Sequence, residues 1–167
     1  MIKVLFQFNQ SVASKPWAAT NDGVMGGLSQ GSARISEHGM LFSGDLSLEN
    51  NGGFSSIRQQ VEMDLSEYQG IRVKVRGDGR VYQLRLESDA RFRDRWAVSF
   101  SGDIPTEPDQ WVEVEVPFDT LRQSWRGREL SEYRFNPAAI QRIGVILADK
   151  KPGNFKVEVA WVAAYKK

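Results

Sequence analysis

The sequence contains no cysteine and only one histidine among its 167 residues. The missing cysteines exclude disulfides, thiolate zinc sites, cysteine-ligated iron–sulfur clusters and a thiol nucleophile. The one histidine, His38, lies in the polar segment "SEHGM", which is typical of a turn before a strand. We therefore expect an exposed turn histidine and not a general base. Hydrolase and metalloprotease motifs are also missing, so the sequence predicts a protein that is not an enzyme.

An excess of charge of one sign is missing as well, because 22 Lys and Arg residues face 21 Asp and Glu residues. This balance gives no support to a nucleic-acid partner or an anionic-membrane partner. No apolar run approaches the roughly 18 residues of a membrane span. The first residues, "MIKVLFQFNQ", alternate in polarity and lack the long apolar core of a signal peptide. These absences predict a cytoplasmic protein without a membrane span.

What the sequence does contain is a period-two alternation of apolar and polar residues, while helical spacing is scarce. In "WVEVEVPF" the valines lie on one face and the glutamates on the other, as in a strand with one side against a core. The length fits one domain, residues 1–167, which we predict to be an all-β, mainly antiparallel β-sandwich with at most one or two short helical turns. Strands are predicted at Ile2–Phe8, Phe54–Met63, Phe92–Phe100, Trp111–Val116, Ile143–Leu147 and Phe155–Ala163.

Turn residues mark the connections between these strands. In "IRVKVRGDGRVYQLRLE" the pair Asp78-Gly79 separates two alternating runs and predicts a β-hairpin. The embedded "RGD" is interpreted as part of that turn and not as an integrin-binding site. The segment "NPAAIQR" predicts a helical turn with Asn136 as its N-cap and proline in first position. Residues 101–110 and 122–135 are predicted to be loops.

Glycine is concentrated in two clusters, "NDGVMGGLSQG" from residue 21 and "ENNGGFSSIRQ" from residue 49. The first matches neither a dinucleotide fingerprint nor a P-loop, because no helical pattern follows and Ser32 replaces the P-loop lysine. We interpret both clusters as turns that lie at a shared end of the sandwich. No cofactor is predicted. No metal site is predicted either, since Asn21 and Asp22 lack the spacing of a calcium loop.

Several of these segments resemble one protein family. "NDGVMGGLSQG", "FSGDLSLENNGGFSSIR", "DLSEYQGIRVKVRGDGRVYQLRL" and "IGVILADKKPGNFKVEVAWV" are similar, in this order, to the NADH:ubiquinone oxidoreductase complex I intermediate-associated protein 30 family. The resemblance implies a galactose-binding-domain-like jelly roll and the role of an assembly factor. Its implied partners are proteins, including assembly intermediates of a respiratory complex, and it implies no catalytic residues. Since the chain starts without an Arg- and Ser-rich transit segment, we expect a bacterial-type stand-alone domain.

The candidate binding patch combines the glycine clusters with nearby aromatic and basic residues. Trp125 lies among polar and basic residues and Trp17 directly precedes the first cluster, so both are predicted to be at the surface. Arginine and aromatic residues dominate protein interfaces, which favours a protein partner. The alternatives are a solvated strand face, or a carbohydrate- or small-ligand-binding module of unrelated bacterial function. The predicted patch comprises Trp17, Asn21, Asp22, Gly26, Gly27, Asn51, Gly53, Arg58, Arg85 and Trp125.

Overall fold

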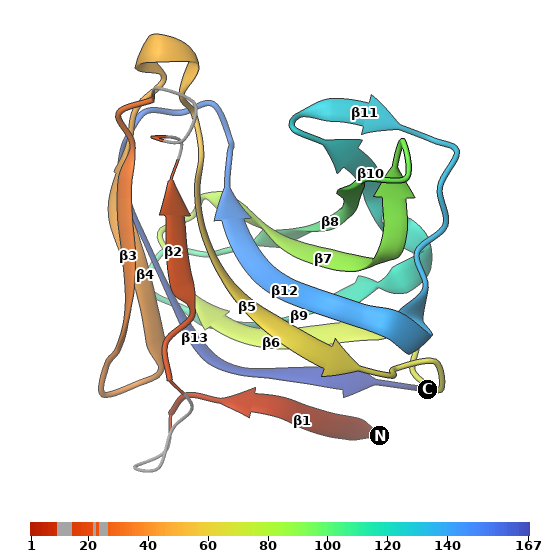
Figure 1. Ribbon diagram of the computed structural model, residues 1–167. Helices are drawn as coiled ribbons and strands as arrows, with labels where there is room; N and C mark the ends of the chain where they lie inside the picture. Colours follow the sequence, from red (N-terminus) through yellow and green to blue (C-terminus); the bar gives the residue numbers. More distant parts are fainter. Residues whose placement is uncertain (10–14, 22, 24–26) are drawn as a thin grey trace.

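The computed structural model describes residues 1–9, 15–21, 23 and 27–167. Over these residues the chain forms two antiparallel sheets that pack face to face, which confirms the predicted jelly-roll sandwich (Figure 1). The first sheet has the order β3-β4-β13-β6-β9, with β1 also paired to β13. Its strands are β1 (Ile2–Gln7), β3 (Gln30–Ile35), β4 (Met40–Leu46), β6 (Gly70–Arg76), β9 (Trp111–Pro117) and β13 (Gly153–Tyr165).

The second sheet has the order β11-β10-β8-β7-β12-β5-β2. In Figure 1 its long strands curve, and β10 and β11 rise at one end of the sheet. We call the face of this sheet that is turned away from the first sheet its outer face. The strands are β2 (Ala18–Asn21), β5 (Ser55–Met63), β7 (Val81–Phe92), β8 (Trp96–Pro105), β10 (Arg122–Trp125), β11 (Arg128–Leu130) and β12 (Ile140–Leu147).

The core lies between the two sheets and follows from the alternation in the sequence. On β7 the side chains of Tyr82, Leu84 and Leu86 are fully buried, whereas the residues between them lie on the outer face. Phe42 and Phe155 from the first sheet pack edge to face, with ring centroids 4.9 Å apart. Each fully buried aliphatic or aromatic side chain contributes about 1.5–3 kcal/mol relative to an exposed one. This burial fixes which face of each strand carries the polar residues.

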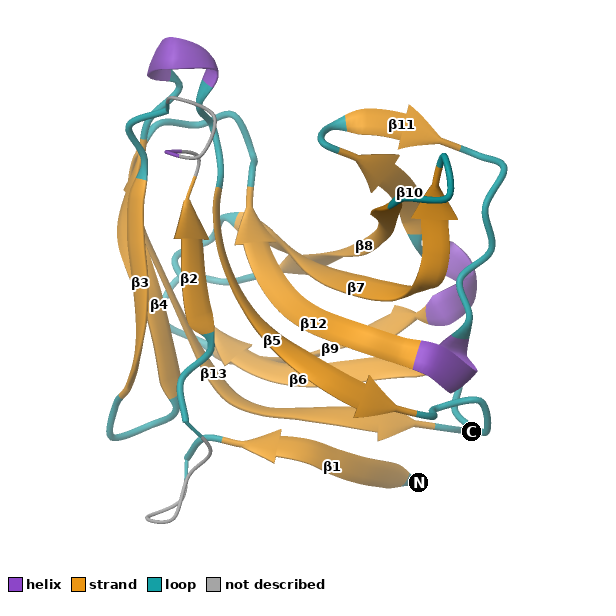
Figure 2. Ribbon diagram, viewed as in Figure 1, coloured by secondary structure: helices purple, strands orange, loops and turns teal. Residues whose placement is uncertain are grey.

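Among the residues that the structure describes, helical structure is restricted to single turns (Figure 2). The described residues contain three 3₁₀ turns, at Glu49–Asn51, Phe118–Thr120 and Pro137–Ala139, one more than the expected maximum. The last confirms the predicted turn, because the Asn136 side chain accepts a hydrogen bond from the Ala138 N–H at 3.1 Å. No helix among the described residues has the length and apolar character needed to cross a membrane.

The predicted β-hairpin around Asp78-Gly79 is wrong, because β6 and β7 belong to different sheets. The segment between them is a corner, and other strands hold it in place. Asp78 accepts hydrogen bonds from the Tyr82 hydroxyl and the backbone N–H of Lys156, and Thr106 accepts one from the Gly79 N–H. The chain therefore crosses to the opposite sheet instead of turning back along β6.

The single strand predicted at Phe92–Phe100 is also wrong, since a turn at residues 93–95 separates β7 from β8. Arg93 and Asp94 have φ angles of 51° and 55°, in the left-handed region where glycine or asparagine is usual. Neither glycine nor asparagine occurs at these two positions, so the sequence pattern did not indicate a turn. The two predicted loops are wrong in part: residues 101–105 continue β8, and residues 122–135 contain β10 and β11.

Candidate functional site

Described residues of the two glycine clusters meet at one end of the sandwich, where Asn21 of β2 pairs with Ser55 of β5. The Asn21 side chain donates to the Gly31 carbonyl at 3.2 Å and accepts a hydrogen bond from the Ser55 hydroxyl. Its polar atoms therefore join three strands of the fold. Asp22 and Gly26 lie outside the described residues. Gly27 lies between β2 and β3, Gly53 has a φ of 127°, and Asn51 ends a 3₁₀ turn.

Trp17 is a core residue, which contradicts its predicted surface position. Its side chain is 2% exposed and packs edge-on against Phe6 and Phe8, with ring centroids 5.2 and 5.8 Å away. Both phenylalanines come from the N-terminal segment, Phe6 from β1 and Phe8 directly after it. Trp17 therefore cannot provide a surface platform for a ligand.

Trp125 lies in a second, smaller aromatic cluster at the far end of the second sheet. Its ring stacks on Phe92 with centroids 4.7 Å apart and an interplanar angle of 13°, and Trp96 lies 5.0 Å away. Phe92 is buried, whereas Trp96 and Trp125 are half-buried. The prediction that Trp125 reaches the surface is therefore confirmed in part.

Four exposed arginines surround this aromatic cluster. Arg93 and Arg95 come from the β7–β8 turn, and Arg126 and Arg128 from the β10–β11 hairpin. Each guanidinium lies over a ring: the distances to the centroids are 4.9 Å for Arg93 on Phe92, 4.9 Å for Arg95 on Trp96, 5.3 Å for Arg126 on Trp125 and 5.7 Å for Arg128 on Phe92. No described carboxylate forms an ion pair with any of them.

We call this arrangement the hairpin-tip surface: Phe92, Arg93, Arg95, Trp96, Trp125, Arg126 and Arg128. Guanidinium groups over aromatic faces are held in place by cation–π attraction and remain free to donate hydrogen bonds outward. Arg126, like Arg93, has a positive φ, of 48°. Non-glycine residues with such backbone angles concentrate at functional sites. The surface can therefore present four fixed positive charges around an apolar centre.

Arg58 and Arg85 lie elsewhere, on the outer face of the second sheet. Both are registered opposite Gly144 of β12, one from each side. Apart from the buried Trp17 and the undescribed Asp22 and Gly26, the structure thus divides the predicted patch into three places: the Asn21 end, the hairpin-tip surface and the Arg58–Arg85 row. Ser101, which follows Arg85 in the same row, was not predicted because it falls in a segment interpreted as a loop.

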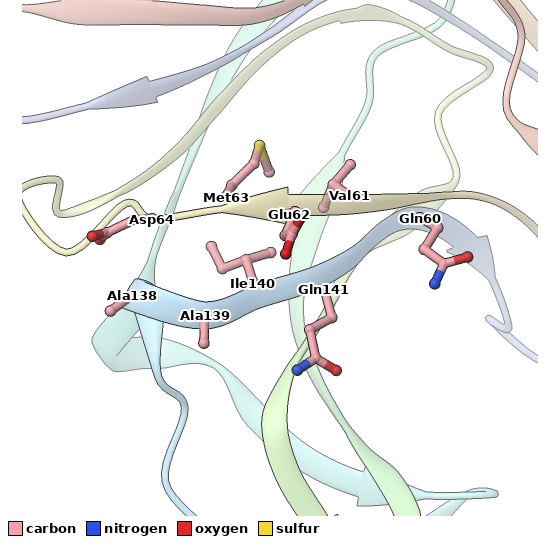
Figure 3. A pocket seen from close by; sticks show the side chains of 9 residues that line it. All are labelled: Gln60, Val61, Glu62, Met63, Asp64, Ala138, Ala139, Ile140 and Gln141. Carbon is pink, nitrogen blue, oxygen red and sulfur yellow. The ribbon is translucent and has the colours of Figure 1, made fainter.

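A hollow lies between the end of β5 and the start of β12 (Figure 3). The pairing of these strands shifts register between Ile140 and Arg142, which opens the surface there. Its acidic residues are Glu62 and Asp64, and the Asp64 carboxylate already accepts hydrogen bonds from the backbone and hydroxyl of Ser66. Within the described chain, no group of three or more His, Cys, Asp or Glu residues could hold a metal. The hollow itself offers no assembled chemistry.

Comparison with known proteins connects this fold to one family. The family model for complex I intermediate-associated protein 30 matches residues 6–159. A probable mitochondrial complex I intermediate-associated protein 30 of Caenorhabditis briggsae is 33% identical over 97 residues, covering 57% of this chain and 28% of that protein. The mitochondrial protein of this name from Mus musculus is 25% identical over 185 residues, covering 98% and 56%. The chain thus spans about half or less of these relatives.

The names of these relatives contradict the predicted cytoplasmic location, because the four that we compared are called mitochondrial. The first residues of the chain therefore gave the wrong indication about location.

Solved structures of similar fold include carbohydrate-binding modules. The family 11 module of a Clostridium thermocellum cellulosomal cellulase superposes with a TM-score of 0.70 at 13% identity, covering 100% of this chain and 95% of that one. A family 30 module of a cellulosomal cellulase from the same organism gives 0.60 at 11% identity, with coverage of 100% and 98%. At such low identity the likeness establishes the β-sandwich fold alone.

Proposed function

Because this chain belongs to the complex I intermediate-associated protein 30 family, we propose that it is a non-catalytic assembly factor that binds protein intermediates of respiratory complex I. The observation that carries the proposal is the family match over residues 6–159, which includes both hairpins of the hairpin-tip surface. The relatives are called mitochondrial, which supports a mitochondrial setting for the proposed role.

The hairpin-tip surface is the contact region that we assign to this role. Arginine and tryptophan are the residue types that most often dominate binding energy at protein interfaces. Here they form one continuous unit, in which stacked rings hold the guanidinium groups at fixed positions. A partner segment with carboxylates around an apolar side chain would match this arrangement in both charge and polarity.

Affinity purification of the tagged full chain from cells that assemble complex I tests the proposal. We expect subunits of complex I intermediates to co-purify, and Arg95→Glu with Arg126→Glu to reduce their recovery about tenfold or more. Lys3→Glu with Arg34→Glu is the matched control, because it makes the same charge change at exposed positions of the first sheet. If the two double variants recovered equal amounts of complex I subunits, the assignment of the hairpin-tip surface would be wrong. If no complex I subunits co-purified with the parent chain, the proposed role would be wrong.

Carbohydrate binding is the second candidate, and the half-buried Trp96 and Trp125 are the residues that favour it. Aromatic faces commonly support sugar rings in binding sites. A glycan array that gave a signal lost in Trp125→Ala would favour this function. A signal that was unchanged in that variant would exclude the hairpin-tip surface as the sugar site.

A further inference from the structure

The outer face of the second sheet carries a row of functional groups from four neighbouring strands. Arg58 of β5 and Arg85 of β7 are each registered opposite Gly144 of β12, and Ser101 of β8 is opposite Arg85. The strands β5, β12, β7 and β8 lie side by side in this order (Figure 1). Directly opposite residues of antiparallel strands project from the same face, so these side chains are neighbours.

Gly144 is opposite both arginines and lines a small space beside them. A Cβ atom at this position would lie 2.6 Å from the Ile57 carbonyl oxygen and 3.0 Å from the Arg58 Cβ, so no larger residue fits without displacement of the backbone. The space is a small, enclosed pocket of about 20 Å³, whose charged lining residues are Arg58, Arg85, Glu87 and Arg142. A volume of roughly 10–15 Å³ admits one water-sized group, so the pocket can take a single oxygen atom and little more.

Two hydrogen-bonding atoms of this row have no partner within the described residues: one belongs to Arg85, which lines the pocket, and the other to Ser101, which is opposite Arg85 on β8 and is not itself a lining residue. The Nε of Arg85 and the Oγ of Ser101 are both buried and make no hydrogen bond. Ser101 is only 6% exposed. Buried polar atoms in native proteins are almost always satisfied, so two neighbouring exceptions indicate a missing acceptor. The acceptor must be small enough to enter the pocket.

The charges around the pocket favour an anionic acceptor. Glu87, its only described carboxylate, forms an ion pair with Arg142 at 3.3 Å, and neither Arg58 nor Arg85 forms an ion pair within the described chain. Burial lowers the pKa of the Arg85 guanidinium, Glu87 raises it, and the nearby charge of Arg58 lowers it further. The two guanidinium groups therefore repel each other in a partly desolvated place, and an anion between them would relieve that repulsion.

We propose that this pocket binds one oxyanion group, a carboxylate or a phosphate, of a ligand that lies on the outer face of the second sheet. Arg85 Nε and Ser101 Oγ donate hydrogen bonds to an oxygen of that group, and Arg58 supplies the second positive charge. Charge-assisted hydrogen bonds from guanidinium are the usual means of holding such groups. The inference does not depend on the proposed role in complex I assembly, because it rests on different residues.

Nuclear magnetic resonance of the arginine Nε–H groups in the full chain tests the proposal. The protein is titrated separately with inorganic phosphate and with acetate, at ionic strength held constant with sodium chloride. We expect one Nε–H resonance, assigned to Arg85 by its loss in Arg85→Gln, to shift saturably with at least one of the anions. The anion that binds more tightly identifies the chemistry of the natural ligand group.

Variants distinguish a specific site from general charge attraction. We expect Arg85→Gln to weaken binding about tenfold or more, and Ser101→Ala to weaken it several-fold while leaving the fold intact, because each removes one donor. Arg122→Gln is the matched control, since Arg122 is next to Ser101 in the same row but pairs with Asp103 outside the pocket. Its affinity should stay within about twofold of the parent.

Two results would overturn the proposal. One is the absence of a saturable shift of the Arg85 signal with either anion up to concentrations on the order of 100 mM, which would assign the pocket to a bound water. The other is an equal loss of affinity in Ser101→Ala and Arg122→Gln, which would show that the anion is attracted by surface charge alone. Circular dichroism of each variant confirms that the comparison is made between folded proteins.

Discussion

Arg80 and Asp149 form a two-pronged ion pair, in which Arg80 Nε donates to Asp149 Oδ2 at 2.9 Å and Nη2 donates to Oδ1 at 2.8 Å. The two side chains are only 12% and 11% exposed. Arg80 also donates to the carbonyl oxygens of Lys151, Gly153 and Asn154. This arginine therefore joins the corner between β6 and β7 to the segment between β12 and β13, and so connects the two sheets at one end.

Removal of the carboxylate should reveal how much this pair stabilises the sandwich. Asp149→Asn leaves Arg80 without its charged partner at a largely buried position, so we expect a loss of about 2–4 kcal/mol in the free energy of unfolding at pH 7. Asp103→Asn is the control, because its pair with Arg122 is 57% and 52% exposed and should be worth less than about 1 kcal/mol. Urea unfolding measures both, and equal losses would contradict the special position of Arg80.

The same pair should contribute to acid sensitivity. Burial raises the pKa of Asp149, but hydrogen bonds and charge from Arg80 and Lys151 outweigh it and hold the pKa below its ordinary value of 3.8. The folded state thus binds a proton less readily than the unfolded state. The contribution of the ionised Asp149 to the free energy of unfolding is fully present above pH 3.8. It is lost as the pH falls through the lower pKa that Asp149 has in the folded state. The stability difference between parent and Asp149→Asn should therefore shrink below pH 3.8, and a constant difference would contradict the assignment.

Trp17 should behave as a core residue in mutagenesis. Trp17→Ala removes a buried ring that contacts Phe6 and Phe8 and should cost about 3–5 kcal/mol in the free energy of unfolding. Trp17→Phe should cost less, because it keeps edge-on contacts and removes a buried Nε1 that has no hydrogen-bond partner in the described chain. Trp125→Ala, at a half-buried position, should cost less than Trp17→Ala. The reverse order in urea unfolding would place Trp17 at the surface after all.

The fold could be predicted from the sequence because burial of one strand face requires alternation, as in Val112, Val114 and Val116. The corner at Asp78 could not. A hairpin and a crossing between sheets bury the same faces of the two strands, and the contacts that decide between them come from Thr106 and Lys156, far along the chain. Local sequence therefore determined which faces are buried, while distant residues determined which strands pair.

The candidate sites were predictable only residue by residue. Arg58 and Arg85 could be selected as polar positions of alternating strands, but their proximity depends on the placement of β12 between β5 and β7. Trp17 was predicted to be at the surface because it precedes the first glycine cluster, whereas its ring packs against Phe6 of β1 and against Phe8. Which residues become neighbours depends on strand order, and a short segment of sequence does not indicate strand order.

Tyr82 should resist ionisation for as long as the protein stays folded. Its side chain is fully buried, and burial followed by the charge of Asp78 raises the pKa of the phenol strongly. The folded state favours the neutral phenol, so Tyr82 contributes fully to the free energy of unfolding below about pH 10, the pKa of the phenol in the unfolded chain. This contribution is lost as the pH rises further. We expect the ultraviolet titration of the parent to show one tyrosine that ionises only on unfolding. Tyr82→Phe should abolish that late phase, and its persistence would assign the phase to another tyrosine.

The β7–β8 turn offers a direct test of whether the hairpin-tip surface is maintained for binding at the expense of stability. Arg93 and Asp94 occupy left-handed backbone angles that Asn-Gly adopts with less strain. Arg93→Asn with Asp94→Gly should therefore raise the free energy of unfolding by about 1 kcal/mol, although it removes the contact of Arg93 with Phe92. If the surface binds a partner, the same variant should recover less of that partner in affinity purification. If the variant were more stable and recovered as much of the partner as the parent does, Arg93 would have no part in the interface. The contact would then rest on Arg95 and the β10–β11 hairpin.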